Sequence, residues 1–135
     1  MKERVPNVAV AGTGWWGKNL VRNFDAIKTA KLYVCCDLDT KLLAQSASLH
    51  PGVKMTTRFE DLLTDPEIDA IAISTNAPSH YRLALDSLKS GKHTFVEKPL
   101  TLVVKEAEEL IRVAKKMDRK LMVGHLLLYL SLIHI

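Results

Sequence analysis

The chain has 135 residues, 47% of them hydrophobic and 25% charged, which is enough for one folded domain with a single core. Its net charge is only +4, and its one local basic run, residues 115–120, contains no aromatic side chain, so the composition argues against nucleic-acid binding. The N-terminus lacks an apolar signal region and the apolar C-terminal stretch is too short to span a bilayer, so we expect a cytoplasmic protein without membrane contact.

Short apolar runs alternate along the chain with segments of helical periodicity. Strands are expected at 7–11, 31–37, 53–57, 68–74, 92–97 and 120–124, and helices near 15–27, 40–49, 59–64, 79–90 and 102–118. Several of the strands are apolar almost throughout, as expected when both faces of a sheet are covered. The alternation predicts an α/β fold with a doubly wound parallel sheet, Rossmann-like, in one domain.

Two adjacent cysteines, Cys35 and Cys36, fall within the second predicted strand. Neighbouring side chains of a strand point to opposite faces of the sheet, which argues against a shared metal ion or a disulfide bond. We therefore expect no metal site and two buried, reduced thiols.

The segment GTGWWGKN follows the first predicted strand and opens the first predicted helix. Its glycines have the Gly-x-Gly-x-x-Gly spacing of a dinucleotide-binding turn, in which phosphate binds backbone amides at a helix N-terminus. The same letters approach a nucleoside-triphosphate P-loop, but that loop needs a hydroxyl after its lysine, and here the residue is Asn19. A dinucleotide site is favoured, with a P-loop NTPase and a purely structural turn as alternatives. The candidate cofactor contacts are Gly12, Thr13, Gly14, Trp15, Trp16 and Gly17.

An acidic residue, Asp37, follows at the end of the second predicted strand, where a carboxylate can accept both hydroxyls of the adenosine ribose. Its charge would repel a 2′-phosphate, and no arginine follows it to attract one, so NAD is favoured over NADP. Lys41, in the next helix, could still reach that region. The nearby Asp39 suits a capping role at the helix start better than cofactor binding, and Ser79 is a second candidate helix cap.

The later segment ISTNAPSHYRLALDSLKSGKHTFVEKPL resembles the cofactor domain of the Gfo/Idh/MocA family of oxidoreductases. In that family the fourth strand ends in a Thr-Pro/Asn-x-x-x-His segment and the fifth in Glu-Lys-Pro. The residues that match are Thr75, Asn76 and His80 in the first segment, and Glu97, Lys98 and Pro99 in the second. With the glycine turn, the resemblance covers residues 5–129.

The resemblance implies roles for these residues at the carboxyl edge of the sheet. Lys98 would be catalytic, as a cation beside the nicotinamide that stabilises the alkoxide of the substrate, and Glu97 would orient Lys98 or the nicotinamide ribose. Thr75 and Asn76 would line the cofactor. His80 would form a wall of the nicotinamide pocket or be a helix-start residue without a role. Without the family, Glu97 and Lys98 could equally be a surface ion pair.

The tryptophan pair invites a simple interpretation, in which Trp15 or Trp16 packs under the first helix and the other covers the edge of the cofactor. The glycine turn together with VGHLLLY at 123–129 also resembles a subgroup that acts on nucleotide sugars. That subgroup includes UDP-N-acetylglucosamine and UDP-N-acetylglucosaminuronate 3-dehydrogenases. The substrate implied is a sugar or nucleotide sugar whose ring alcohol exchanges hydride with NAD. A non-catalytic, redox-sensing dinucleotide module is the alternative.

Members of the family carry a second α/β domain, which builds the substrate pocket, supplies a histidine as general base and forms the oligomer interface. The resemblance thus implies that residues 1–129 are the dinucleotide-binding domain of a homo-oligomeric enzyme and that this piece alone is inactive. Residues 130–135, LSLIHI, equal the translation of a transposon adapter used in sequencing libraries. We therefore expect them to be a non-native tail.

Overall fold

The computed structural model describes residues 3–125. The strands are β1 (Asn7–Ala11), β2 (Lys31–Cys36), β3 (Lys54–Thr56), β4 (Ala70–Ile73), β5 (His93–Glu97) and β6 (Leu121–Gly124). The helices are α1 (Gly17–Ala26), α2 (Thr40–Leu49), α3 (Phe59–Thr64), α4 (His80–Lys89) and α5 (Val104–Lys116), and a 3-10 turn, η1 (Ala77–Ser79), precedes α4. Apart from η1, every element lies where the periodicity predicts it, and no end differs by more than two residues. The predicted tail at 130–135 lies outside the described residues.

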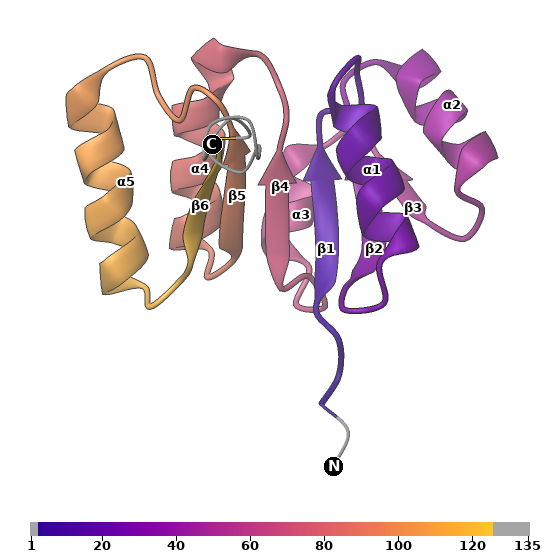
Figure 1. Ribbon diagram of the computed structural model, residues 1–135, viewed down its shortest axis with the longest axis horizontal. Coiled ribbons are helices and arrows are strands. Elements are labelled where there is room, and N and C mark those ends of the chain that lie inside the picture. The colour runs from indigo at the N-terminus through magenta and orange to yellow at the C-terminus, as the bar shows by residue number, and fades with distance from the viewer. Residues whose placement is uncertain (1–2, 126–135) are drawn as a thin grey trace, which may run out of the picture.

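The strands form one parallel sheet in the order β3-β2-β1-β4-β5-β6 (Figure 1). The predicted doubly wound parallel sheet is confirmed. After β3 the chain crosses to the other side of β1, so β1 and β4 are neighbours although two strands separate them in sequence. Loops that leave neighbouring strands toward opposite faces open a crevice at the carboxyl edge, and the β1–β4 boundary is such a switch point.

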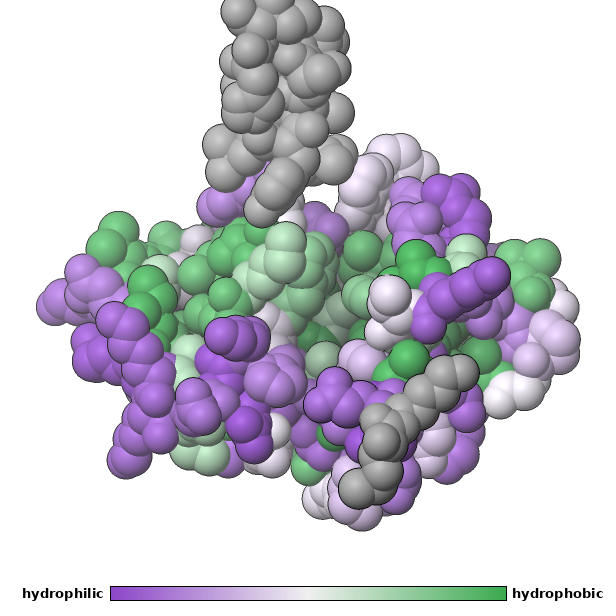
Figure 2. Space-filling model, turned by 60° about the horizontal axis from the view of Figure 1, so that its bottom comes forward, coloured by the Kyte–Doolittle hydropathy of each residue, from purple (hydrophilic) through white to green (hydrophobic). Residues whose placement is uncertain are grey.

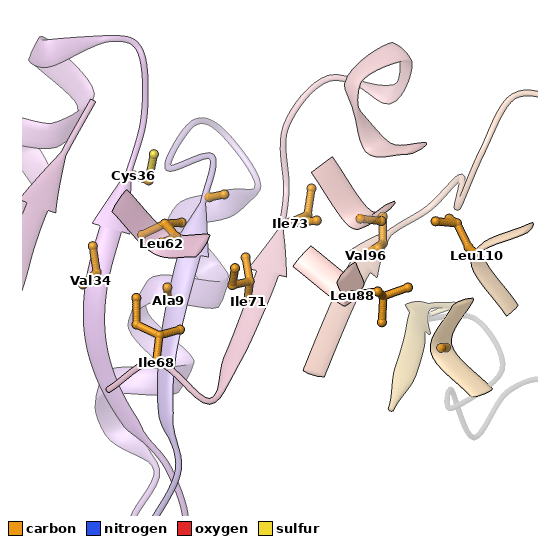
Figure 3. Packing of buried hydrophobic residues seen from close by; sticks show 13 residues of the cluster. Ala9, Val34, Cys36, Leu62, Ile68, Ile71, Ile73, Leu88, Val96 and Leu110 are labelled. Carbon is orange, nitrogen blue, oxygen red and sulfur yellow. The ribbon is translucent and has the colours of Figure 1, made fainter. Parts of the chain in front are cut away.

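The two faces of the sheet are covered by different helices. Val21 of α1 and Leu43 of α2 pack with Val10 of β1 on one face. On the other face, helices α3, α4 and α5 bury Leu62, Leu88 and Leu110 against the sheet (Figure 3). Both faces of the central strands β1 and β4 are covered, which agrees with their being apolar apart from Asn7 at the start of β1.

One stretch of the sheet has no helix over it within residues 3–125. On β5 and β6 the side chains opposite α4 and α5 include Phe95 and its register partner Met122, and Met122 is 50% exposed. Figure 1 shows β6 and β5 lying in front of α4 with this face open. Figure 2 shows apolar side chains gathered in a band across the molecule with hydrophilic ones around them. The face of β5 and β6 opposite α4 and α5 is therefore left open within the described residues.

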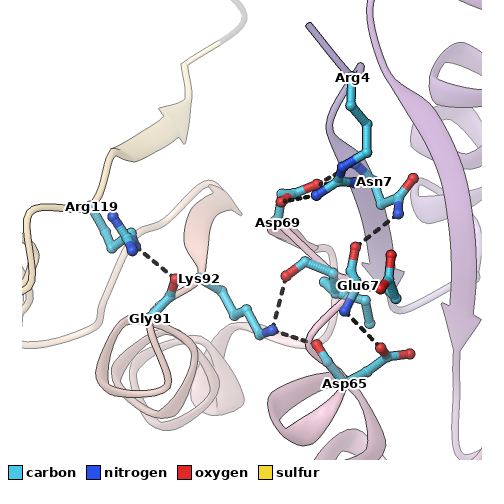
Figure 4. Close-up of polar contacts among 9 residues, drawn as sticks. Arg4, Asn7, Asp65, Glu67, Asp69, Gly91, Lys92 and Arg119 are labelled. Atoms are coloured by element: carbon cyan, nitrogen blue, oxygen red, sulfur yellow. Dashed lines mark hydrogen bonds and ion pairs between the residues drawn. The ribbon is translucent and has the colours of Figure 1, made fainter.

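The amino edge of the sheet is closed by polar contacts (Figure 4). The buried ammonium group of Lys92 donates hydrogen bonds to the carbonyl oxygens of Asp65 at 2.6 Å and Ile68 at 2.9 Å. Burial lowers the pKa of Lys92. Nearby, the guanidinium of Arg4 pairs with Asp69 at 3.0 Å. The polar side chains at this edge therefore form hydrogen bonds and an ion pair with neighbouring loops of the same chain.

The two cysteines behave as the sequence predicts. Cys35 faces the α1–α2 layer and Cys36 faces the α3–α5 layer, and both are buried, free thiols. Burial raises the pKa of each thiol to about 12, with smaller contributions from Asp25 on Cys35 and from Asp37 on Cys36. No group of three or more metal-ligating side chains exists among residues 3–125.

These thiols predict a loss of stability at alkaline pH. A thiol whose pKa is raised by folding stabilises the native state fully below the unfolded pKa near 9, and this contribution is lost as the pH rises toward about 12. For each thiol the free energy of unfolding should fall by about 1.4 kcal/mol per pH unit in this window. Urea denaturation at pH 8 gives the baseline, and denaturation at pH 10 and 11 measures the slope. A Cys35→Ala/Cys36→Ala variant should have a shallower slope, and an identical one would contradict the assignment.

Candidate functional site

The glycine loop between β1 and α1 is shaped by close backbone contacts. Gly12 has a positive φ of 94°, and a Cβ atom on it would lie 2.4 Å from the carbonyl oxygen of Ser74 at the end of β4. A Cβ atom on Gly17 would lie 1.9 Å from the carbonyl oxygen of Gly12. On Gly14 the nearest atom would be a methyl carbon of Leu42 at 3.9 Å. Two glycines therefore serve the fold of the loop, whereas Gly14 leaves open space above it.

The N-terminus of α1 is partly free to meet an anion, because the N–H of Lys18 donates to the carbonyl oxygen of Gly14 at 3.1 Å and that of Asn19 to Trp16 at 2.9 Å, which leaves the N–H of Gly17. The helix begins at Gly17 with Trp16 at the N-cap, it has no side-chain cap, and its first turn contains no acidic residue. The first amides of a helix have no partner within the helix, and its dipole places partial positive charge there. With Gly14 open beside it, this end of α1 fits a phosphate or pyrophosphate group.

Asp37, directly after β2, is attached to the glycine loop. Its Oδ2 accepts hydrogen bonds from the backbone N–H of Thr13 at 2.8 Å and from the Thr13 hydroxyl at 3.2 Å, and its Oδ1 accepts one from the N–H of Asp39 at 2.9 Å. A carboxylate has about four acceptor positions, so capacity for a ribose hydroxyl remains. The carboxylate therefore also fixes the loop, a role that the sequence did not predict. Asp39 caps α2 as expected, by accepting from the N–H of Lys41 at 2.8 Å.

A groove of about 570 Å³ runs along the carboxyl edge of the sheet. It lies between the glycine loop, the ends of β2 and β4 and the loop after β3. Gly12, Gly14, Asp37, Thr75 and Asn76 line it together, so the structure gathers these predicted site residues at one place.

The groove also contains Arg58, which sequence reasoning missed. Arg58 follows β3 in the chain, and β3 pairs with β2, so the loop carrying Arg58 lies beside the end of β2. Its side chain is 71% exposed, and its Nε lies 3.9 Å from Asp61. No arginine directly follows Asp37 in the sequence, as noted above. The pairing of β2 with β3 nevertheless brings Arg58 to the same groove.

The loop after β4 differs from the prediction in its capping. Ser79 occupies the N-cap position of α4 but makes no side-chain cap. Its hydroxyl donates instead to the carbonyl oxygen of Asn76 at 2.8 Å and contacts the Thr75 hydroxyl at 2.6 Å. The reason is η1, which places Ser79 in a helical conformation before α4 begins, so the hydroxyl points backward.

His80, the first residue of α4, is 1% exposed and does not belong to the residues that line the groove. Its Nδ1 lies 2.7 Å from the carbonyl oxygen of Pro99, and its Nε2 lies 2.9 Å from the carbonyl oxygen of Thr75. The ring therefore connects the loop after β4 with the loop after β5.

Glu97 and Lys98 lie where β5 ends. Glu97 is half-buried, and its carboxylate lies against Gly124 of β6. A Cβ atom on Gly124 would come within 2.9 Å of the Glu97 Oε2. Lys98 is exposed, the peptide bond to Pro99 is cis, and Lys98 forms no ion pair with any described residue. Within residues 3–125 the alternative of a Glu97–Lys98 surface ion pair is therefore not observed.

The tryptophan pair does not pack as expected. Trp15 is 82% and Trp16 38% exposed, so neither lies under α1, and their ring centroids are 6.3 Å apart. The reason is that Gly17 and Val21 are the buried residues of α1, and both tryptophans precede the helix on its outer side. Trp15 borders a second groove, between α1 and α2, of about 450 Å³.

Comparison with known proteins agrees with this geometry. Residues 6–125 match the GFO_IDH_MocA family, described as an oxidoreductase family with an NAD-binding Rossmann fold. An inositol 2-dehydrogenase/D-chiro-inositol 3-dehydrogenase from Lactiplantibacillus plantarum is 32% identical over 121 residues, which are 87% of this chain and 34% of that protein. The chain thus spans about a third of the length of this curated relative.

Two solved structures are similar in fold. An NAD-binding protein from Listeria innocua has a TM-score of 0.84 at 27% identity, covering 90% of this chain and 35% of that one. A biliverdin reductase from Synechocystis, solved with biliverdin and NADP+, has a TM-score of 0.85 at 27% identity, covering 90% of this chain and 38% of that one. The family match favours a dinucleotide site over a P-loop or a purely structural turn at the glycine loop.

In the part of the chain that the structure describes, no helix has the length and apolar character needed to cross a membrane.

Proposed function

The chain belongs to the Gfo/Idh/MocA oxidoreductase family with its NAD-binding Rossmann fold, and we propose that it is the cofactor-binding half of an NAD-dependent dehydrogenase that oxidises a ring alcohol of a sugar. One observation carries this proposal. Gly12 and Gly14, in the loop that leads into α1, and the carboxylate of Asp37 line a single groove on the carboxyl edge of the sheet. An anion and a ribose are therefore accommodated next to each other, as a dinucleotide requires.

The residues present fit the cofactor. The diphosphate would lie over Gly14, in space that a Cβ atom would otherwise occupy, and would accept a hydrogen bond from the N–H of Gly17 at the start of α1. The adenosine ribose would bind Asp37, whose Oδ atoms are already aligned by Thr13 and Asp39. Thr75 and Asn76 would line the other side of the groove.

The chemistry at the other end of the cofactor would involve Lys98. When bound, the nicotinamide supplies the acceptor or donor of hydride. The ammonium group of Lys98, exposed at the end of β5, would hydrogen-bond the substrate oxygen and stabilise its developing negative charge. Glu97, half-buried next to it, would orient Lys98 or the nicotinamide ribose.

The substrate proposed is a polyhydroxylated ring. The name of the relative from Lactiplantibacillus plantarum, an inositol dehydrogenase, supports a sugar-like ring alcohol. A nucleotide sugar such as a UDP-sugar is the finer proposal, supported by the glycine turn with its tryptophan pair. Trp15 and Trp16 give an exposed aromatic surface beside the glycine loop, where a sugar face or a base can stack.

The active enzyme would need more than this domain. We propose a second domain that supplies the substrate pocket and the general base, a homo-oligomeric assembly and a cytoplasmic location. The length of the relatives supports the second domain, because the matched segment is only 34% of the inositol dehydrogenase.

Cofactor binding tests the proposal directly. NADH titrated into the chain should quench the emission of its two tryptophans by energy transfer, with a lower Kd than NADPH. Asp37→Asn should raise the Kd for NADH by roughly tenfold, because it loses a charge-assisted hydrogen bond to the ribose. The matched control is Asp39→Asn, which alters the cap of α2 and should leave the Kd within about twofold. No NADH binding at millimolar concentration would refute the function.

A further inference from the structure

A buried histidine connects the two loops that carry the proposed nicotinamide contacts. His80 is 1% exposed, and both of its ring nitrogens lie within hydrogen-bond distance of a backbone oxygen. One oxygen belongs to Thr75, which directly precedes Asn76 in the loop after β4. The other belongs to Pro99, which directly follows Lys98 in the loop after β5. The imidazole thus spans from one strand end to the next.

The partners of the ring define what it must do chemically. A carbonyl oxygen only accepts hydrogen bonds, so the ring holds a loop by donating an N–H to its carbonyl. The groups that face it are the carbonyls of Thr75 and Pro99 and the N-terminal end of its own helix α4; no carboxylate within residues 3–125 bonds to it.

Neither loop has another connection of this kind among the described residues. Thr75 is otherwise bonded only within its own loop, through Ser79. Lys98 forms no side-chain hydrogen bond or ion pair that would hold it in place. Beyond the pairing of β4 with β5, His80 is thus the side chain that joins the two loops through hydrogen-bond contacts in the described part of the chain.

We propose that His80 is a positioning residue. By filling the space between the carbonyl oxygens of Thr75 and Pro99, with a ring nitrogen against each, it fixes Asn76 and Lys98 relative to each other, so that the nicotinamide half of the cofactor finds its contacts preformed. This rests on the proposed function. The glycine loop and Asp37 do not bond to His80, so the ADP half of the cofactor binds without it.

The experiment compares two ligands on the 135-residue chain. His80→Phe removes both ring nitrogens, and the Kd for NADH should rise at least tenfold while the Kd for ADP changes less than about threefold. His80→Gln keeps one amide donor, and its loss of NADH affinity should be intermediate. The matched control is His93→Phe, which removes the imidazole that accepts from the N–H of Lys120 at the opposite end of β5. This variant should bind both ligands like the wild type.

Circular dichroism establishes whether each variant is folded. If His80→Phe does not fold, the comparison rests on His80→Gln. Equal NADH affinity in wild type and His80 variants would overturn the inference. Parallel weakening of NADH and ADP would overturn it as well, because it would reveal a general loss of structure. If the wild type binds neither ligand, the proposed function fails instead.

A spectroscopic readout is independent of the cofactor. In ¹H–¹⁵N spectra of the imidazole region, the wild type should show a slowly exchanging ring N–H signal that disappears in His80→Phe. The absence of such a signal in the wild type would contradict a hydrogen bond from this ring to either loop.

Discussion

Replacing Gly17 by alanine is expected to destabilise the domain by about 3 kcal/mol and to abolish cofactor binding. The added Cβ atom would lie 1.9 Å from the backbone carbonyl oxygen of Gly12, which no side-chain rotation can relieve. The start of α1 must then move away from the loop, and with it the backbone N–H proposed to hold the diphosphate. Urea denaturation measures the loss of stability, and fluorescence titration with NADH measures binding.

Gly14→Ala is the matched control, since it adds the same methyl group within the same loop. Here the nearest atom is a methyl carbon of Leu42 at 3.9 Å, an ordinary contact, so the free energy of unfolding should stay within about 0.5 kcal/mol of the wild type. The affinity for NADH should nevertheless fall at least tenfold, because the methyl group occupies the proposed place of the diphosphate. A Gly14→Ala variant with unchanged NADH affinity would place the diphosphate elsewhere.

Replacing Lys98 by methionine is expected to lower kcat by about 10²- to 10⁴-fold in the full-length enzyme that contains this domain. The change keeps the length and apolar stem of the side chain and removes only its charge. Lys98 forms no ion pair with residues 3–125, so the fold should lose nothing. Steady-state kinetics with a ring polyol measures turnover, and a separate titration should give an NADH Kd within about threefold of the wild type.

The control for Lys98 is Lys89→Met, which removes an exposed lysine from the last turn of α4, at the opposite edge of the sheet. Its kcat should equal that of the wild type. Unchanged turnover in Lys98→Met would remove Lys98 from the mechanism and favour the alternative of a non-catalytic, redox-sensing dinucleotide module.

Local patterns in the sequence were sufficient for the elements and for the general location of the site. Apolar periodicity is a property of neighbouring residues, and it predicted β1, α2 and α3 with their observed ends. The alternation of strands and helices implied a parallel sheet, and a parallel sheet brings the residues after each strand to one edge. Gly12 and Asp37 could therefore be assigned to one site before any contact between them was known, and Thr75 was added to it by the resemblance of its segment to the family.

The contacts that depend on strand order were beyond such patterns. Arg58 reaches the groove of Asp37 only because β3 pairs with β2. The hydroxyl of Ser79 caps nothing because an unpredicted 3-10 turn precedes α4. The exposure of Trp15 and the burial of His80 likewise follow from how α1 and α4 sit on the sheet.

The sequence by itself determined the α/β class, the extents of the elements and the dinucleotide turn, because these depend on the periodicity and chemistry of residues close together in the chain. Only the tertiary structure decided that Asp37 fastens the glycine loop through Thr13, and that His80 joins the loops of Thr75 and Pro99. Hydrogen bonds of this kind form between atoms that approach one another only after the strands have paired, so no local pattern encodes them.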